Sequence, residues 1–277
     1  MALKTILLHL DDAPRCVERT RVAAQLAVQH EAHLIGLYAI DTWALPATQA
    51  LVGEHPLVVK EQQRLRDNRE IAAHKFQEAV RWAGASAEWR AAEGDPVTAM
   101  RVNARYADLV VLGQTDPDQS APLVPNDFPE LVCFASGRPV LVVPYTGNFK
   151  QLGERVLVAW NASREATRAV TDGLPILEAA SRVDVLTINP SRHRDAHGEI
   201  PGADIAWFLA RHGVKAQTVN SFVDSDVGAE ILTRAADLDS DLIVMGAYGH
   251  SRLRELALSG ATRTMLQSMT VPVLMSH

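Results

Sequence analysis

One stretch of the chain decides its fold: Asp241-Leu242-Ile243-Val244-Met245-Gly246-Ala247-Tyr248-Gly249, followed after nine residues by Ser259-Gly260-Ala261-Thr262. The unbroken apolar run has the length of a strand and is partly β-branched, so it predicts a buried parallel strand that ends at Gly246. The glycines allow a turn with positive φ. Because residues 261–268 have helical composition, the stretch predicts a strand, a turn and a helix N-terminus in that order.

Three segments of the first half recur in the second half. Ile6-Leu7-Leu8-His9-Leu10-Asp11 matches Val156-Leu157-Val158-Ala159-Trp160-Asn161, 150 residues later. At an offset of 133 residues, Asp108-Leu109-Val110-Val111-Leu112-Gly113 matches residues 241–246, and residues 139–143 match residues 272–276. The second half is therefore 17 residues shorter before its fourth strand. We place this difference in the second helix, which is long at Leu57–Trp82 and short at Ala203–Arg211.

Strands and helices alternate in both halves. Strands are expected near residues 4–10, 33–40, 86–92, 108–112 and 139–144, and again near 155–160, 183–189, 214–220, 241–245 and 271–276. This alternation predicts an α/β fold of two tandem, doubly wound, parallel five-stranded sheets with right-handed crossovers. The expected domains are residues 1–147 and 153–277, and the linker is the polar, glycine-bearing segment Tyr145–Glu154.

Each half ends in an apolar strand, at residues 139–143 and 272–276. An apolar edge strand invites aggregation unless it is paired or covered. We therefore expect these two strands to pair with each other within the chain, across a pseudo-two-fold axis. A homodimer of the whole chain is kept as an alternative.

The turn after Met245 has the features of a phosphate-binding site. Free N–H groups and the helix dipole favour an anion at a helix N-terminus. In open parallel sheets, ligands lie at the carboxyl ends of the strands, where both Asn161 and Gly246 fall. The sequence contains no Gly-Lys-(Ser/Thr), so the turn is not a Walker A loop.

The spacing of this turn resembles the G-x2-G-x9-G-(S/T) signature of the universal stress protein family. Gly94-Asp95-Pro96 is similar to the Gly-x-Pro turn of that family, and Arg138-Pro139-Val140 is similar to its usual ending. The resemblance covers nearly the whole chain, as a tandem pair of such domains.

This resemblance implies a site for ATP, with AMP or ADP as alternatives and Mg²⁺ as an accompanying ion. Adenine and ribose are expected between the end of the first strand of the second half and Ile188, and the phosphates over the glycine turn. No catalytic or metal-ligating residue is expected. The expected cofactor-binding residues are Ala159, Trp160, Asn161, Ile188, Met245, Gly246, Gly249, His250, Ser259, Gly260, Ala261 and Thr262.

The sequence departs from the family signature at two places. Asn161 stands where the family usually has Asp, which replaces an acceptor-only carboxylate by an amide that also donates. Ser259 occupies the place of the third glycine and Gly260 that of the usual hydroxyl residue, while a hydroxyl returns at Thr262. Because the backbone donors survive both changes, we expect weaker binding rather than none.

The first half has lost the turn. The counterparts of Gly249, Ser259, Gly260, Ala261 and Thr262 are Asp116, Asn126, Asp127, Phe128 and Pro129. Each carboxylate would repel a phosphate by at least ~1 kcal/mol in a low-dielectric cleft. Pro129 also removes a backbone donor. We therefore expect no nucleotide polyphosphate in the first half.

Composition narrows the class of protein. The chain has 277 residues, 47% of them apolar and 22% charged, which is enough to bury a substantial core. The net charge of −6 argues against a nucleic-acid surface. With two cysteines, Cys16 and Cys133, no disulfide framework is indicated and a reducing cytoplasm fits. The N-terminus lacks the features of a signal peptide, and no stretch approaches the ~20 apolar residues of a membrane span.

Other polar groups are weaker candidates. The spacing His193-x3-His197 and the cluster Asp116, Asp118, Asp127 and Glu130 favour solvated loops over metal sites. Arg252, Arg254 and Arg263 favour surface solvation over phosphate contacts, and Trp160 and Trp207 favour core or dimer packing. His250 could contact a phosphate or cap a turn.

The sequence thus predicts a cytoplasmic, tandem nucleotide-binding protein with a nucleotide-sensing stress or signalling role. Its expected partners are adenine nucleotides and other proteins, with neither nucleic acid nor membrane. Two alternatives stay open. One is a slow ATPase or nucleotidyl-transfer enzyme, for which His250 is the only general base in view near the turn. The other is an interaction scaffold that has lost the nucleotide.

Overall fold

A computed structural model describes residues 2–41, 56–118, 124–190, 200–224, 226–248 and 260–277, with residues 56–58, 61 and 62 described by their backbone alone. The chain forms two compact units. One consists of Leu3–Arg138, and the other of Pro139–His277 with Met1–Ala2.

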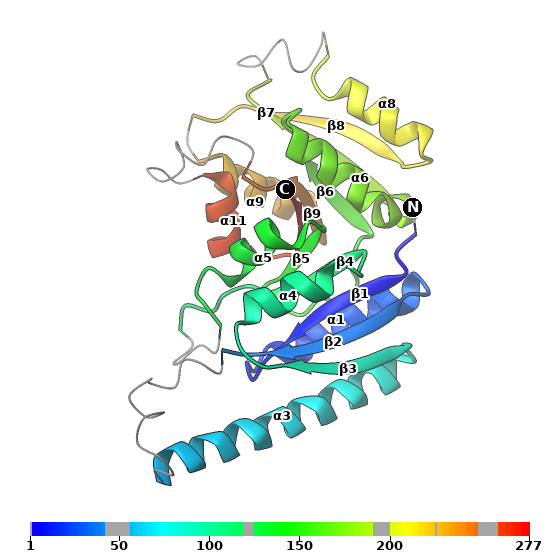
Figure 1. Ribbon diagram of the computed structural model, residues 1–277. Helices are drawn as coiled ribbons and strands as arrows, with labels where there is room; N and C mark the ends of the chain where they lie inside the picture. Colours follow the sequence, from blue (N-terminus) through cyan, green and yellow to red (C-terminus); the bar gives the residue numbers. More distant parts are fainter. Residues whose placement is uncertain (1, 42–55, 119–123, 191–199, 225, 249–259) are drawn as a thin grey trace. The chain divides into compact units, whose positions relative to one another are not determined.

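The unit Leu3–Arg138 contains four parallel strands in the order β3-β2-β1-β4. Its helices pack in two pairs, α1 with α3 and α4 with α5, and the sheet is covered by them (Figure 1). The elements are β1 (Thr5–Leu10), α1 (Cys16–Gln29), β2 (His33–Ala39), α3 (Pro56–Ala83), β3 (Ala87–Ala92), α4 (Pro96–Ala104), β4 (Leu109–Gly113) and α5 (Phe128–Ser136).

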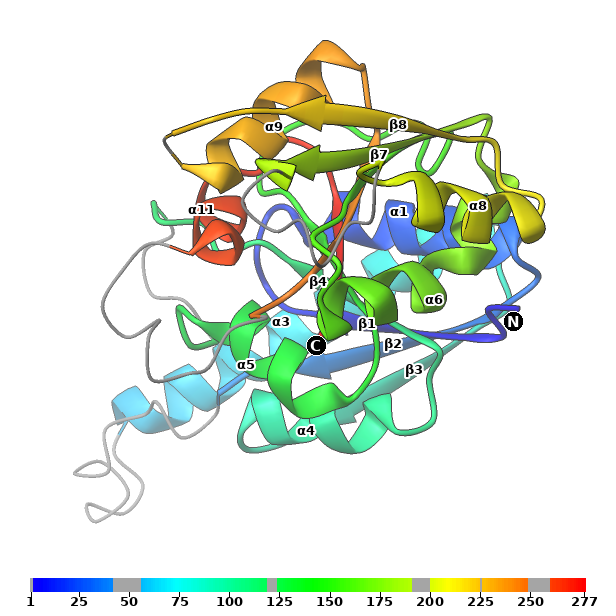
Figure 2. The same cartoon turned by 90° about the horizontal axis from the view of Figure 1, so that it is seen from above.

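The unit that begins at Pro139 contains six strands in the order β5-β10-β9-β6-β7-β8. All neighbours are parallel except β5 and β10. Helix α6 packs on β9 and β10, and α9 packs on α11 (Figure 2). The elements are β5 (Val140–Val143), β6 (Arg155–Ala159), α6 (Arg164–Ala179), β7 (Arg182–Ile188), α8 (Ala203–Arg211), β8 (Ala216–Ser221), α9 (Val227–Asp237), β9 (Leu242–Gly246), α11 (Ala261–Ser268) and β10 (Val273–Ser276).

The predicted α/β fold with mostly parallel strands is confirmed. Every expected strand is present within about two residues of its expected bounds, and the structure contains both Ala203–Arg211 and residues 261–268 as helices. The strands divide four and six between the compact units rather than five and five, because β5 pairs with β10. The sequence-based domain boundaries at residues 147 and 153 stay a proposal.

In each half, an equivalent aspartate holds the first strand against the fourth strand by hydrogen bonds. Asp108, at the start of β4, accepts the backbone N–H groups of Lys4 and Thr5 at 2.8 and 2.9 Å. Asp241, at the start of β9, accepts those of Gly153 and Glu154 at 2.7 and 3.0 Å. These bonds satisfy donors that the sheet leaves unpaired where the first strand begins. They explain why an aspartate opens the motif in both halves.

The two C-terminal strands of the halves pair as expected. In the antiparallel ladder, Val140 lies opposite Met275, Leu141 opposite Leu274, and Val142 opposite Val273. Exchanging each residue for its counterpart 133 positions away maps this ladder onto itself, with Leu141 and Leu274 at its centre. All the residues of both strands are buried. The pairing therefore covers two apolar edges at once.

Deleting residues 272–277 should expose the apolar edges of β5 and β9 and produce dimers or larger aggregates. Size-exclusion chromatography with light scattering measures this. The matched control is a chain that lacks His277 alone, which follows β10 and should stay monodisperse. A fully soluble, monomeric chain without residues 272–277 would contradict the role assigned to the ladder.

Candidate functional site

The sheet of the second unit brings the predicted site segments together. Strand β6 lies between β9 and β7, with Ala159 paired in register with Met245. On its other side, the N–H of Trp160 donates to the carbonyl of Leu186 at 2.8 Å, two residues before Ile188. The chain leaves β6 toward β7 and reaches β9 on the opposite side, so this edge is the topological switch point where ligands bind in such sheets.

A tight turn joins β6 to α6. The Oδ1 atom of Asn161 accepts the N–H of Ser163 at 3.1 Å, and Ala162 between them has a φ of 58°. Ser163 is the N-cap of α6, and its Oγ accepts the N–H of Ala166 at 3.1 Å. The oxygen of Asn161 is therefore used to hold the turn. Its amide group keeps a donor that an aspartate at this place would lack.

Gly246 is required by the packing of α6. A Cβ atom at Gly246 would lie 2.5 Å from the backbone nitrogen of Ala166 and 2.6 Å from the backbone carbon of Glu165. Backbone atoms cannot move away as a flexible side chain could, so any larger residue would push the helix off the strand. This contact accounts for Gly246 without reference to a ligand.

The turn after β9 is tied to the start of α11. Tyr248 has a φ of 57°, and its N–H donates to Oγ1 of Thr262 at 3.3 Å. Gly260 is the N-cap of α11, with no side-chain cap, and its carbonyl accepts the N–H groups of Arg263 and Thr264 at 2.9 and 3.2 Å. The first N–H groups of this helix have no acceptor within it, which suits them to an anion.

Three of the expected binding residues, Gly249, His250 and Ser259, lie outside the described residues, as do Arg252, Arg254, His193 and His197. The described part of the turn consists of its two ends, Gly246–Tyr248 and Gly260–Thr262. These ends lie within hydrogen-bonding reach of each other through the hydroxyl group of Thr262. That much of the expected juxtaposition is therefore present.

Asp226 holds α11 against α9. Its carboxylate caps α9 by accepting the N–H of Gly228 at 2.7 Å, and it accepts the hydroxyl proton of Thr264 at 2.7 Å. The hydrogen bond from Thr264 is the main reason that the pKa of Asp226 lies below its usual value, with the backbone bonds adding to the effect. A Cβ atom at Gly228 would lie 2.9 Å from the carbonyl oxygen of Ala261, so the helices touch.

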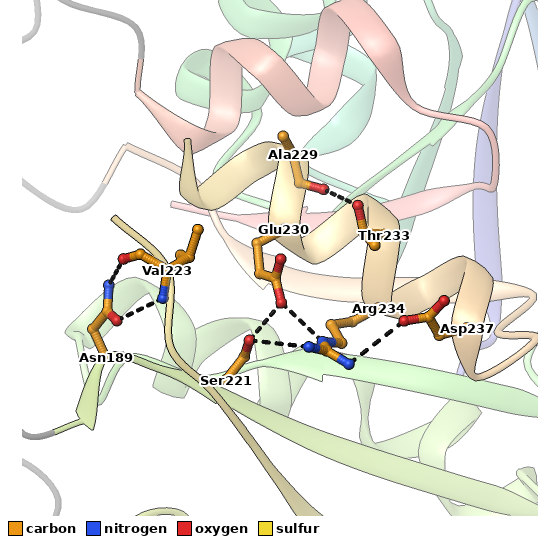
Figure 3. A network of polar contacts seen from close by, with 8 residues as sticks. All are labelled: Asn189, Ser221, Val223, Ala229, Glu230, Thr233, Arg234 and Asp237. Atoms are coloured by element: carbon orange, nitrogen blue, oxygen red, sulfur yellow. Dashed lines mark hydrogen bonds and ion pairs between the residues drawn. The ribbon is translucent and has the colours of Figure 1, made fainter. Parts of the chain in front are cut away.

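A second polar network fixes the loops at the carboxyl ends of β7 and β8 (Figure 3). The amide of Asn189 donates to the carbonyl of Val223 at 2.6 Å and accepts its N–H at 2.9 Å. Glu230 accepts from Ser221 and from Nε of Arg234. The hydrogen bond from Ser221 is the main reason that the pKa of Glu230 lies below its usual value, and the bond from Arg234 adds to the effect. Sequence analysis missed Asn189, Asp226 and Thr264, although an aspartate before a helical stretch is an N-cap signal.

In the first unit, side chains fill the corresponding space. Arg19 is buried; its Nε donates to the carbonyl of His9 at 3.0 Å and its Nη2 pairs with Asp11 at 2.9 Å. The Nη1 atom lies 2.0 Å from where Gly113 would carry a Cβ. The ring of His9 donates from Nε2 to the carbonyl of Ala39 at 2.8 Å and lies 4.6 Å from the ring of Phe128. Burial is the main reason that the pKa of His9 falls to about 4.

All three of these large residues have alanine counterparts in the second half. His9 corresponds to Ala159 and Arg19 to Ala169 at the offset of 150, and Phe128 corresponds to Ala261 at the offset of 133. The buried positions of α1 and α6 agree with this alignment almost residue by residue. Sequence analysis found the Phe128 replacement and missed the other two. The charges also differ as a pair, since Asp11 and Arg19 are replaced by the neutral Asn161 and Ala169.

Among the residues that the structure describes, the remaining candidates form no site. Cys16 and Cys133 are free and buried, and burial raises the pKa of the Cys133 thiol to about 12. Trp207, expected in the core or at an interface, has 67% of its surface exposed, so packing in the core is wrong. Within the described ranges, no three carboxylate, imidazole or thiol side chains gather to hold a metal ion. The same described residues contain no helix with the length and apolarity to cross a membrane.

Comparison with solved structures identifies the fold. A universal stress protein from Archaeoglobus fulgidus DSM 4304 superimposes over 98% of this chain and 95% of its own, with a TM-score of 0.76 at 16% identity. A functionally unknown protein from Pseudomonas aeruginosa PAO1 covers 99% and 92%, with a TM-score of 0.60 at 19% identity. A universal stress protein in complex with cAMP covers 53% of this chain and 100% of its own, with a TM-score of 0.38 at 22% identity.

The amino-acid sequence also matches the model of a known protein family. No curated protein matches the chain. The model of the "Universal stress protein family" matches residues 153–277, the half that carries the glycine turn. Residues 153–277 are therefore similar to the universal stress protein family, and over its whole length the chain has the fold of the Archaeoglobus fulgidus universal stress protein.

Proposed function

We propose that this protein binds one adenine nucleotide per chain, in its second half, and serves as a nucleotide-responsive stress or signalling protein. The observation that carries the proposal is the contrast between the halves. His9, Arg19 and Phe128 occupy the switch point of the first unit, whereas alanines stand at the same places in the second. Small residues at a strand end and a helix N-terminus leave room for a ligand to approach the backbone.

The proposed ligand is ATP, with AMP and ADP as alternatives and Mg²⁺ as its counter-ion. Adenine and ribose would lie against Ala159, Trp160, Asn161 and Ile188, and the phosphates against Met245, Gly246, Gly260, Ala261 and Thr262. Backbone N–H groups at the start of α11 are the main donors for the phosphates. Arg263, exposed in the first turn of α11, supplies a cation within reach of the same end of the helix.

The role is that of a binding protein rather than an enzyme in this proposal. We propose a reducing, cytoplasmic setting, because both cysteines are free and buried. Other proteins are the proposed recipients of the nucleotide signal. Phosphate release from ATP by the purified protein, followed over several hours, separates this role from a slow ATPase. An unchanged nucleotide that stays bound supports the binding role.

Isothermal titration calorimetry with ATP and Mg²⁺ should give a stoichiometry near one per chain. The reason is that carboxylates, Pro129 and a buried Arg19 occupy the site of the first half. The nucleotide that copurifies with the protein, identified by mass spectrometry, is an independent readout. A stoichiometry near two with equal affinities would overturn the asymmetry between the halves, and no binding at all would favour the scaffold.

Copying the first half into the second should abolish binding. The double substitution Asn161→Asp and Ala169→Arg recreates the Asp11–Arg19 pair where the nucleotide is proposed to lie. We expect ATP to bind at least 100-fold more weakly, equivalent to about 2.7 kcal/mol. Thr171→Arg adds an arginine at an exposed position of the same helix, α6, and is the control for Ala169→Arg. Unchanged ATP affinity in a folded double variant would contradict the site.

Gly249→Asp, which copies Asp116, should also remove binding without unfolding the chain. A carboxylate in the glycine turn repels phosphate, and a Cβ atom restricts the backbone there. Ser268→Asp places the same charge at the other end of α11 and should leave the ATP affinity within a few-fold of the parent. Micromolar affinity in Gly249→Asp, roughly −8 kcal/mol, would show that the phosphates lie elsewhere.

A further inference from the structure

A separate cavity lies in the first unit, at the carboxyl end of β1, and is lined by residues of α1 and α3. Its volume is about 230 Å³. At the ~30 Å³ that a water molecule occupies in the liquid, this is room for roughly eight non-hydrogen atoms. None of the residues proposed to hold ATP belongs to it, so it stands independently of the proposed function.

The wall of the cavity carries the carboxylate of Asp12, which has no cationic hydrogen-bond donor among the residues that the structure describes. Asp12 accepts the phenol proton of Tyr38 at 2.7 Å on Oδ1 and the amide of Asn68 at 2.7 Å on Oδ2. Both donors are neutral. The neighbouring Asp11 also lines the cavity, but it is paired with the guanidinium group of Arg19 at 2.9 Å. A carboxylate has about four lone-pair sites, so Asp12 can accept two further hydrogen bonds.

Tyr38 is the donor in its hydrogen bond with Asp12. Burial, followed by the hydrogen bond to Asp12, raises the pKa of the Tyr38 phenol far above its usual value. The phenol therefore keeps its proton and donates it, and Asp12 is the acceptor. Tyr38 and Asn68 hold the carboxylate from two different elements, β2 and α3, which fixes its orientation before any ligand arrives.

A cation lines the same cavity. Lys75 projects from α3, two turns after Asn68, and it has neither a hydrogen-bond nor an ion-pair partner among the described residues. A carboxylate and an ammonium group on the wall of one small cavity, not paired with each other, suit a ligand that carries both opposite charges. A simple anion would be repelled by the carboxylate of Asp12, and a simple cation would be repelled by the ammonium group of Lys75.

The rest of the wall is apolar. Val17 on α1 and Ile71 on α3 line the cavity although 50% and 51% of their surfaces are exposed, while Phe76 is buried. Covering two exposed aliphatic side chains with an apolar group is favourable, at about 25 cal/mol per Å² of surface removed from water. The ligand should therefore have an aliphatic body beside its charged groups.

We propose that this cavity binds a free α-amino acid with an aliphatic side chain of about the size of leucine. Its ammonium group donates to Asp12, its carboxylate pairs with Lys75, and its side chain packs against Val17, Ile71 and Phe76. Leucine has nine non-hydrogen atoms, which agrees with the roughly eight that the volume admits. The first half of the chain is then a small-molecule site of a different chemistry from the second.

Calorimetric titration of the full-length protein with L-leucine tests the proposal. We expect a dissociation constant of about 1 mM or tighter, since two charge contacts and an apolar contact are offered. 3-Methylbutylamine, which lacks the carboxylate, and 4-methylpentanoate, which lacks the amine, should each bind at least tenfold more weakly. No leucine binding at millimolar concentration, or equal binding of the amine alone, would overturn the proposal.

Substitutions locate the binding in the cavity. Asp12→Asn and Lys75→Gln, which remove one charge each, should both weaken leucine binding at least tenfold. Asp67→Asn and Lys60→Gln are the matched controls, because both lie on α3 outside the cavity lining and should not affect it. Thermal unfolding confirms that each variant is folded. ATP affinity should be unchanged in all four variants, and leucine binding that Asp12→Asn and Lys75→Gln leave intact would contradict the assignment.

Discussion

In each half, the rest of the structure depends on the parallel pairing of the first strand with the fourth. β1 pairs with β4, and β6 with β9, although the paired residues Ile6 and Leu109 are 103 positions apart and Val156 and Leu242 are 86 positions apart. Asp108 and Asp241 clamp the start of each pair through backbone N–H groups. The crossovers to the strands on either side run in opposite directions. A crevice therefore forms at the carboxyl ends of the two paired strands, which is the topological switch point of the sheet. The described residues of the candidate nucleotide site lie at this end of the sheet or in the turns that follow it.

The same pairing also requires a glycine at the end of the fourth strand, whether or not a ligand binds. The helix after the first strand crosses the end of the fourth strand so closely that Gly246 has room for no side chain. In the first half, the space beside Gly113 contains the guanidinium group of Arg19. A glycine at this place is thus a packing requirement of the fold, and the glycine turn begins on a residue that the fold already needs.

The two halves differ in whether large side chains fill the space at the carboxyl ends of the paired strands. In the first half, Arg19 neutralises Asp11 and the two are buried together with His9 and Phe128. Removing one member of a buried ion pair leaves an unpaired charge, which costs about 3–5 kcal/mol, so single substitutions do not reopen the space easily. In the second half, Asn161 and Ala169 carry no charge, and no internal partner is needed. The divergence of the halves is therefore a change of several residues that act together.

The sequence by itself determined the order, the type and nearly all the bounds of the helices and strands, because apolar periodicity and glycine turns are local properties of the chain. The two internal offsets determined which half carries the glycine turn and which last strands pair. The tertiary structure alone decided that His9 and Arg19 fill the switch point, that Asp226 and Thr264 hold α11 in place, and that Asp12 and Lys75 share a cavity. Those contacts join segments far apart in the chain, and their formation depends on how closely the helices pack on the sheet.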